Sequence, residues 1–285
     1  MEPIKPLPYG ENCDYNEEEK KVWQQCLDAG LDGEEVNTVL SYTAVLQTIR
    51  GNWDEKNRVQ TTKDYFKLMV DYRTKTDCYK KLHEENEDVN FFDKNWDTRI
   101  YGKDNHGHYI FVERICWYKP AALIDYFKSD DHLTNTRAVL CEAIESKKGN
   151  DKKNFNGLYK HVHILDLTGL SFGHFSSKVR GVCKNVVVEM GNFYPETIHK
   201  LMFVNASLGF RAIWSICKPW LHKITLEKTK VLGSGVKLVE ELKRNDIEIG
   251  SIPDFLGGEN KGERLRGWID FCRKRGEGKE ENSGT

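Results

Sequence analysis

The sequence predicts an α/β protein in which a lobe of helices precedes a domain of alternating strands and helices. Residues 14–82 carry apolar side chains at helical spacing, interrupted by Gly and Asn residues that separate three or four helices. Residues 99–113 contain two β-rich runs joined by a turn rich in Asp, Asn and Gly. The strand–helix–strand order that follows is typical of an α/β layer structure.

Individual elements follow from the spacing of apolar residues. Asp14 and Asn16 can cap the first helix, and Glu17, Glu18 and Glu19 lie in its first turn, where the helix dipole favours acidic side chains. We expect strands at residues 99–102, 108–113, 159–167 and 201–205, with a short edge at 247–252. We expect helices at residues 121–146, 179–190, 212–220, 225–232 and 236–242, and one more around Trp268.

The composition excludes two broad classes of protein. Of the 285 residues, 39% are hydrophobic and 31% are charged, which is too polar for an integral membrane protein and too apolar for a disordered chain. No apolar run is long enough to span a bilayer, and the acidic N-terminus lacks the pattern of a secretory or transit leader. Eight dispersed cysteines without a C-x-x-C pair favour a reducing compartment, so we expect a cytoplasmic protein.

Charge is distributed unevenly along the chain. The net charge of −1 argues against bulk affinity for nucleic acid. Residues 1–98 hold 13 basic and 21 acidic side chains, whereas residues 178–244 hold 12 basic and 5 acidic ones. The second half is therefore expected to meet an acidic partner, unless the two halves simply attract each other.

Motifs for common catalytic chemistries are absent from the sequence. It contains no G-x-S-x-G, no P-loop, no G-x-G-x-x-G and no H-E-x-x-H, so we expect no enzyme, no catalytic residue and no metal cofactor. The glycines at 233 and 235 follow a predicted helix and are best explained as a helix stop. Asp166 ends a predicted strand without a second carboxylate nearby in sequence, and we interpret it as a structural cap.

His161 and His163 form an H-x-H pair on a predicted strand. Side chains two residues apart lie on the same face of a strand, so both imidazoles would face the same way. Two imidazoles could bind a metal or haem if a third ligand existed, which the sequence does not identify. The alternative is a pair of hydrogen-bonded polar residues that face a cavity.

Five short motifs occur in a fixed order in the second half of the chain. They are D-L-T-G-L-S at 166–171, Y-P-E at 194–196, F-V-N-A-S-L-G-F at 203–210, T-L-E-K-T-K at 225–230 and L-G-G at 256–258. Each is weak alone, but together they resemble the CRAL-TRIO lipid-binding domains, and within them the phosphatidylinositol-transfer type. The resemblance implies an N-terminal helical lobe at 1–94, a CRAL-TRIO lipid-binding domain at 95–258 and a C-terminal tail at 259–285.

The resemblance also implies a mixed β-sheet flanked by helices, with a movable gate helix over an apolar cavity. Burying acyl chains is favourable by about 0.8 kcal/mol per CH₂ group, which requires such a cavity. Residues 208–221, here named the gate segment, are rich in apolar and aromatic side chains. The gate and acyl-chain residues implied are Leu208, Phe210, Ile213, Trp214, Ile216 and Trp220. Basic residues near them suit an anionic membrane surface.

Head-group residues are implied by the same resemblance. Glu196, Thr225 and Lys228 match positions that contact inositol phosphate in phosphatidylinositol-type members, where Lys can pair the phosphate and Thr can donate a hydroxyl. His161 and His163 stand where members that also carry phosphatidylcholine have Ser and Thr, so they are counted with the head-group site. Of a basic pair on the helical lobe of the family, only Arg50 is in register.

The resemblance therefore implies a lipid-binding and lipid-transfer protein that is cytoplasmic and peripheral at membranes. It would hold one phospholipid, with phosphatidylinositol as the first candidate, and would need no cofactor beyond that ligand. A second hypothesis is a sensor or carrier of another hydrophobic ligand, such as a retinoid, tocopherol, sterol or haem. A third is a lipid-regulated signalling adaptor that binds a signalling protein through its acidic helical lobe.

Overall fold

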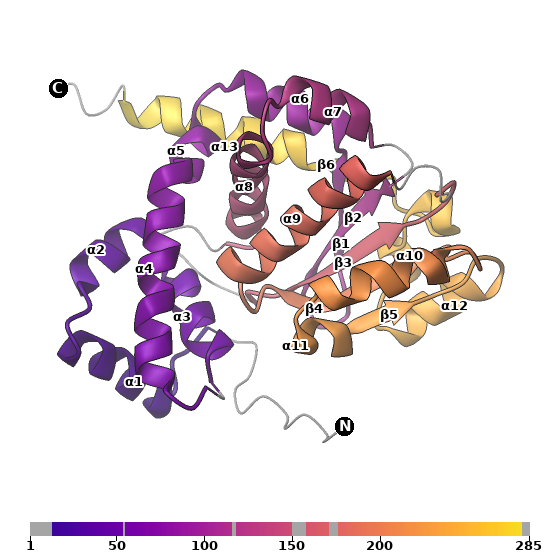
Figure 1. The fold of residues 1–285 in the computed structure, drawn as a ribbon. Coiled ribbons are helices and arrows are strands. Elements are labelled where there is room, and N and C mark those ends of the chain that lie inside the picture. Colours follow the sequence, from indigo (N-terminus) through magenta and orange to yellow (C-terminus); the bar gives the residue numbers. More distant parts are fainter. Residues whose placement is uncertain (1–12, 54, 116–117, 150–157, 171–175, 281–285) are drawn as a thin grey trace.

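The computed structural model describes residues 13–53, 55–115, 118–149, 158–170 and 176–280. Within these residues, six helices precede the first strand, and the first four share one hydrophobic cluster that forms the helical lobe (Figure 1). The six helices are α1 (Glu17–Asp28), α2 (Gly33–Val39), α3 (Tyr42–Gly51), α4 (Arg58–Thr76), α5 (Cys78–His83) and α6 (Glu87–Asn95). The α/β fold class, with a helical lobe followed by a mixed sheet and flanking helices, is confirmed.

Polar residues before the helices set where the lobe's helices begin. Asn16 accepts a hydrogen bond from the backbone N–H of Glu19, and the Glu19 side chain accepts one from Asn16 in return, which is a complete capping box. The side chains of Asp32, Ser41 and Asn86 likewise accept hydrogen bonds from backbone N–H groups in the first turns of α2, α3 and α6. Asn16 is therefore the cap of the first helix, and Asp14 is not.

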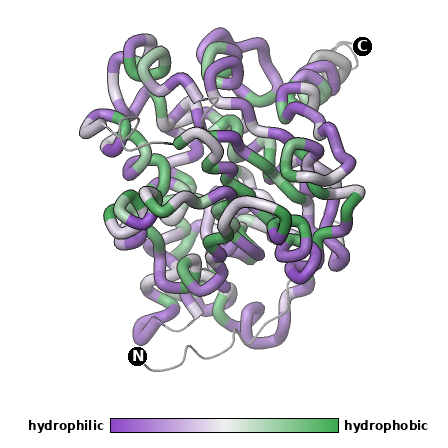
Figure 2. The backbone as a smooth tube through the Cα atoms, turned by 90° about the vertical axis from the view of Figure 1, so that its right-hand side faces the viewer, coloured by the Kyte–Doolittle hydropathy of each residue, from purple (hydrophilic) through white to green (hydrophobic). Residues whose placement is uncertain are grey.

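A six-stranded mixed sheet lies at the centre of the molecule (Figure 1). The strands are β1 (Thr98–Lys103), β2 (Tyr109–Arg114), β3 (His161–Asp166), β4 (Ile198–Val204), β5 (Thr229–Val231) and β6 (Glu263–Arg264). Their order is β5-β4-β3-β2-β1-β6, and β2 to β5 run parallel while β1 pairs antiparallel with both neighbours. Hydrophobic segments run through the middle of the molecule, with hydrophilic segments outside them (Figure 2).

Helices cover both faces of the sheet. They are α7 (Pro120–Tyr126), α8 (Asp130–Lys147), α9 (Ser177–Phe193), α10 (Phe210–Cys217), α11 (Lys223–Glu227), α12 (Lys237–Arg244) and α13 (Leu265–Glu280). On one face, Ile110 and Val112 of β2 pack with Leu238 and Leu242 of α12. On the other face, Phe111 packs into a cluster with residues of α8 and α9. This second face is the one on which a ligand cavity is built.

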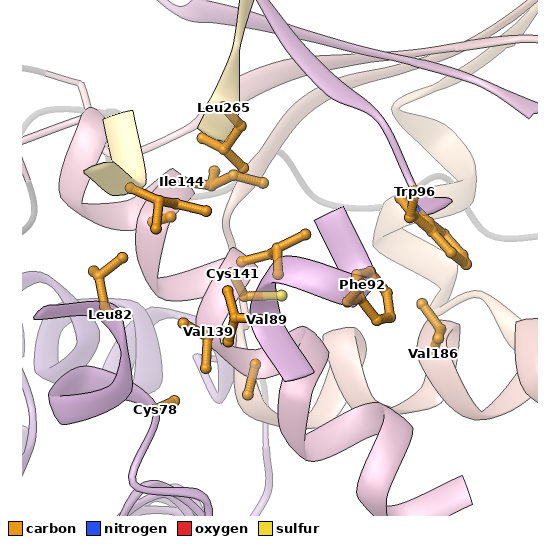
Figure 3. Close-up of a cluster of buried hydrophobic side chains, with 14 of the residues drawn as sticks. Cys78, Leu82, Val89, Phe92, Trp96, Val139, Cys141, Ile144, Val186 and Leu265 are labelled. Atoms are coloured by element: carbon orange, nitrogen blue, oxygen red, sulfur yellow. The ribbon is translucent and has the colours of Figure 1, made fainter. Parts of the chain in front are cut away.

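The largest hydrophobic cluster joins elements that are far apart in sequence (Figure 3). Its labelled members come from α5, α6, α8, α9, α13 and the end of the lobe: Cys78, Leu82, Val89, Phe92, Trp96, Val139, Cys141, Ile144, Val186 and Leu265. The helix predicted around Trp268 is α13, and Leu265, Ile269 and Cys272 are buried in this cluster. The segment expected as a tail thus contributes to the main core.

The lobe is tied to the rest of the protein by polar contacts as well. The Nε atom of Arg73 in α4 lies 3.2 Å from a carboxylate oxygen of Glu142 in α8, and both side chains are largely buried. The hydroxyl of Tyr72 donates a hydrogen bond of 2.7 Å to Glu189 of α9. These contacts, together with the shared core, fix α4 and α5 against the sheet's helices.

Three sequence predictions of secondary structure are wrong in detail. The helix expected over 121–146 is two helices, because Ser129 has an extended backbone and caps α8. The helix expected over 225–232 ends at Glu227, and residues from Thr229 form β5 because they pair with β4. The edge expected at 247–252 contains a 3₁₀ turn, Ile249–Ser251, instead of a strand.

Cys26, Cys78 and Cys141 form no disulfide and are buried, and Cys272 is buried as well, which is typical of cysteines that act as small apolar fillers. Cys116 lies outside the described residues. Within the part of the chain that the structure describes, no helix combines the length and apolar character that a bilayer crossing requires.

Candidate functional site

A cavity of about 640 Å³ opens between the sheet, α9 and the gate segment. That volume lies within the range of roughly 300–1,000 Å³ typical of small-molecule sites. The sheet contributes Leu165, Leu201 and Phe203 to its wall. The α9 helix contributes Val182, Val186 and Met190 among others. The wall is therefore largely apolar and suits a hydrocarbon chain.

Most of the predicted gate residues line this cavity. Phe210, Ile213, Trp214 and Trp220 all do so. The rings of Phe203 and Trp214 have centroids 5.1 Å apart, and Phe210 lies 5.5 Å from Phe203, so aromatic contacts seat α10 on β4. The contact between α10 and β4 is thus made by aromatic side chains and does not depend on a glycine.

The remaining two gate residues lie elsewhere. Leu208 precedes α10 and is 81% exposed, and Ile216 is partly buried outside the cavity wall. Only Phe210 and Ile213 of α10 are buried in the small cluster that holds this helix. The gate segment is therefore attached to the sheet through few buried side chains, which is typical of elements that move.

Glu196 lies at one end of the cavity between two lysines. Its Oε2 atom is 2.9 Å from Nζ of Lys160 and 3.3 Å from Nζ of Lys228. The Lys160 side chain is almost fully buried, Glu196 is buried and Lys228 is partly exposed. One carboxylate between two ammonium groups leaves an excess positive charge, which favours an anionic ligand group.

The charges of this triad shift its pKa values in a consistent way. Burial alone would raise the pKa of Glu196, but the charges of Lys160 and Lys228 outweigh it and hold the pKa below its usual value. Burial lowers the pKa of Lys228, and Lys160 adds to that shift while Glu196 opposes it. Glu196 also has a φ of 54°, a left-handed conformation that non-glycine residues adopt at a cost.

Thr225 lies beside this triad on the cavity wall, in the short helix α11. Its carbonyl oxygen accepts a hydrogen bond of 2.7 Å from the Thr229 hydroxyl, which links α11 to the start of β5. The three residues that the sequence assigned to the inositol end, Glu196, Thr225 and Lys228, are thus together on the lining of one cavity. Their role toward a ligand remains a prediction.

His161 and His163 lie on the same face of β3, as the alternation of a strand predicts, and Nε2 of His161 is 3.4 Å from Nδ1 of His163. His163 lines the cavity and its Nε2 is 3.5 Å from Oε1 of Glu113, whereas His161 is not part of the lining. Nδ1 of His161 faces Nζ of Lys148 at 3.4 Å. Burial, with the Lys148 charge, lowers the pKa of His161 well below its usual value, so the imidazole is neutral.

No third metal ligand joins the two histidines. Among the described residues, the group of His, Cys, Asp or Glu side chains close enough to share a metal ion is Asp104, His108 and His199, which lies off the cavity wall. His161 and His163 instead belong to a buried hydrogen-bonding chain that runs from Glu113 to Lys148.

The CRAL/TRIO domain profile matches residues 94–258. The chain belongs to the CRAL/TRIO domain family. The motifs at 166–171, 194–196 and 203–210 thus lie within a CRAL/TRIO domain, and the cavity lies on the β3 and β4 face of that domain.

Relatives with transfer-protein names are similar to this CRAL/TRIO chain. Phosphatidylinositol/phosphatidylcholine transfer protein SFH11 of Arabidopsis thaliana is 30% identical over 205 residues, which cover 68% of this chain and 50% of that protein. SFH14 of the same plant, with the same descriptive name, is 29% identical and covers 60% of this chain and 30% of that protein. The chain thus spans half or less of the length of these relatives.

A solved structure shares the fold of this CRAL/TRIO chain. The crystal structure of Sfh5 aligns with a TM-score of 0.59 at 16% identity, over 80% of this chain and 84% of that one. At this identity the likeness concerns the fold alone.

Arg50 is the lobe residue in register with the basic pair of the CRAL/TRIO family, and in this chain it is buried in an ion pair. Its Nε atom lies 2.8 Å from Oε1 of Glu19, and both side chains are almost fully buried. The guanidinium also lies over the ring of Tyr159, 5.3 Å from its centroid. Arg50 does not line the cavity. It links the lobe to Tyr159, just before the start of β3.

Sequence reasoning missed residues on and behind the cavity wall. Lys160, which contacts the wall residue Glu196 without being part of the lining, was overlooked, although a lysine directly before an apolar strand with H-x-H was a visible signal of a buried charge. Glu113 and Arg137 line the cavity, with Oε1 of Glu113 3.6 Å from Nη2 of Arg137. Arg137 lies in the middle of the apolar pattern of α8, where a charge is unusual, and this pattern could have identified it.

Proposed function

We propose that this protein binds one amphiphilic lipid in the cavity and exchanges it at membrane surfaces, with phosphatidylinositol as the first candidate. The observation that carries the proposal is the apolar cavity of about 640 Å³ whose wall includes Glu196 and Lys228, with the buried Lys160 in contact with Glu196. Hydrocarbon would lie against the apolar wall, and a phosphate would meet the excess positive charge.

The chemistry of the triad supports an inositol phosphate head group. Lys228 can pair a phosphate as a point charge, and the hydroxyl of Thr225 can donate to it. Glu196 can accept from inositol hydroxyls, although its two lysine contacts already occupy one oxygen. The names of SFH11 and SFH14 support the same ligand class, since both are phosphatidylinositol/phosphatidylcholine transfer proteins.

Exchange would require the gate segment to move. Its helix α10 is held by few buried side chains, and Leu208 at its start projects an apolar side chain into solvent. An exposed leucine next to basic residues is suited to contact with an anionic membrane. We therefore propose a non-enzymatic carrier that acts in the cytoplasm and contacts membranes transiently.

Native mass spectrometry of the protein incubated with phosphatidylinositol vesicles tests this proposal. We expect one bound phosphatidylinositol per chain, and its occupancy should fall about tenfold or more in Lys228→Ala, since charge-assisted hydrogen bonds contribute about 1.5–3 kcal/mol. Lys237→Ala, an exposed lysine on α12, is the matched control. Absence of bound and exchanged phospholipid would refute the proposal, whereas binding unaffected by Lys228→Ala would refute only the head-group assignment.

A further inference from the structure

A second polar cluster lines the same cavity, away from the lysine triad. It consists of Trp96, Glu113, Tyr118, Arg137 and His163, here named the Arg137 cluster. Glu113 of β2 is paired in register with Leu165, whereas Lys160 precedes the first residue of β3. At about 3.3 Å per residue, the backbone positions of Glu113 and Lys160 are separated by roughly 16 Å along the strand, and His163 lies between them.

The carboxylate of this cluster is fully engaged. Oε1 of Glu113 accepts a hydrogen bond of 3.0 Å from the Thr98 hydroxyl, and Oε2 accepts one from Tyr118. His163 and Arg137 approach Oε1 at 3.5 and 3.6 Å. Burial alone would raise the pKa of Glu113, but the His163 and Arg137 charges and these donors hold it far below its usual value.

Three donor atoms of the cluster are not engaged by the described residues. The Nε and Nη1 atoms of Arg137 and the Nε1 atom of Trp96 are buried and have no hydrogen-bond acceptor among the described residues. Each of the two side chains is only 7% exposed. A buried donor without an acceptor carries a cost of about 1–3 kcal/mol, so such groups are rare unless something else supplies the acceptor.

A purely structural role explains only part of this arrangement. Arg137 balances the charge of Glu113, and its guanidinium lies over the ring of Trp96, 5.0 Å from the centroid. Those contacts use Nη2 and the face of the guanidinium, and they leave Nε and Nη1 directed at no acceptor. The packing of the described residues likewise provides no acceptor for the indole N–H of Trp96.

We propose that Arg137 and Trp96 form a second polar subsite that binds an oxygen acceptor within the cavity, such as the carboxylate of a fatty acid or the carbonyl of an ester. The free groups are donors only, so they fit a ligand group that only accepts. This inference goes beyond the proposed function, because it assigns a ligand contact that phosphate binding at Lys228 does not use.

Three single-chain probes distinguish the possible ligand chemistries. Hexadecanoic acid, its methyl ester and hexadecylamine share one alkyl chain and differ in the polar group. The subsite predicts that the acid, the ester or both bind to the full chain more tightly than the amine in native mass spectrometry. Equal occupancy by all three, or preference for the amine, would overturn the proposal. The free donors would then be satisfied by water, or Glu113 would select the ligand's polar group.

Two variants connect that preference to the named atoms. Trp96→Phe removes only the indole N–H, and Arg137→Lys keeps the charge opposite Glu113 but removes Nε and the planar fork. Each should reduce the preference for acid or ester over amine by about tenfold. Trp268→Phe is the matched control, because its buried Nε1 also lacks an acceptor but lies off the cavity wall.

The outcomes separate this proposal from the proposed function. If both folded variants keep the wild-type preference, Arg137 and Trp96 do not hold the ligand's oxygen and the inference is wrong. That result would leave phosphatidylinositol binding at Lys228 untouched. Conversely, a protein that binds no phospholipid can still show the acid or ester preference, because the probes carry no phosphate.

Discussion

The buried Nζ atom of Lys160 lies 2.9 Å from Oε2 of Glu196, the same oxygen that lies 3.3 Å from Nζ of Lys228. Glu196 can neutralise only one of the two lysines, so the triad keeps a positive charge beside an apolar cavity. The sequence motifs include Glu196 and Lys228, whereas the contact of Lys160 with Glu196 is revealed only by the fold.

Lys160→Met should weaken the binding of phosphatidylinositol. The substitution lets Glu196 neutralise Lys228, so the phosphate would lose its excess positive charge and occupancy should fall about tenfold. Quantitative native mass spectrometry measures that change. Lys200→Met is the control, since Lys200 pairs with Asp246 outside the cavity. Unchanged occupancy in Lys160→Met would show that Lys160 serves only to hold Glu196.

His161 should make the protein less stable in mild acid. Its pKa is lowered well below the unfolded value of about 6.5, so the folded state binds fewer protons than the unfolded state as the pH falls through 6.5. The contribution of the neutral imidazole is present above that pH and is lost below it. In urea unfolding, the stability advantage of the wild type over His161→Gln should therefore shrink between pH 7 and pH 5. A difference between wild type and His161→Gln that stays constant from pH 7 to pH 5 would contradict the prediction.

Ile269→Ala should destabilise the whole protein. Ile269 lies in α13 and is completely buried in the main core, so its truncation should cost about 2–5 kcal/mol through lost burial and the cavity left behind. The urea midpoint measures this loss. Phe271→Ala, on the same helix but 45% exposed, should lower the midpoint much less. Equal effects would mean that α13 does not belong to the cooperative core.

Leu208→Asp should impair membrane contact without affecting the fold. Leu208 is 81% exposed, so the charge meets water in the free protein. Burying a leucine side chain contributes about 1.5–3 kcal/mol, and its loss should weaken co-sedimentation with anionic vesicles about tenfold or more. Leu68→Asp, at an exposed position on α4, is the control. If both variants bind vesicles as the wild type does, the membrane contact lies elsewhere.

Much of the architecture could be predicted from local pattern. The capping box at Asn16 and the alternation through β2 and β3 specify their elements because the determining contacts are near in sequence. The strand β5 was missed because Thr229 and Val231 become a strand only by pairing with β4.

The candidate site was predictable to the extent that it rests on motifs. Glu196, Thr225 and Lys228 lie on the lining of one cavity, while their assignment to a lipid head group stays a prediction. The apolar pattern of α8 could mark Arg137 as a buried charge, but not as a site residue, because its donors without an acceptor among the described residues become apparent only once α8 is packed against Trp96. Arg50 illustrates the reverse case, since a residue in the register of a binding position is instead buried against Glu19.

The packing of α13 has a consequence for how a ligand enters. By contacting both α5 and α8, this last helix fastens the beginning of the chain to its middle, and the Arg73–Glu142 pair strengthens the same junction. This junction resists a separation of the two halves of the molecule. The lipid exchange proposed above would therefore depend on a local displacement of α10, of which Phe210 and Ile213 are the buried residues.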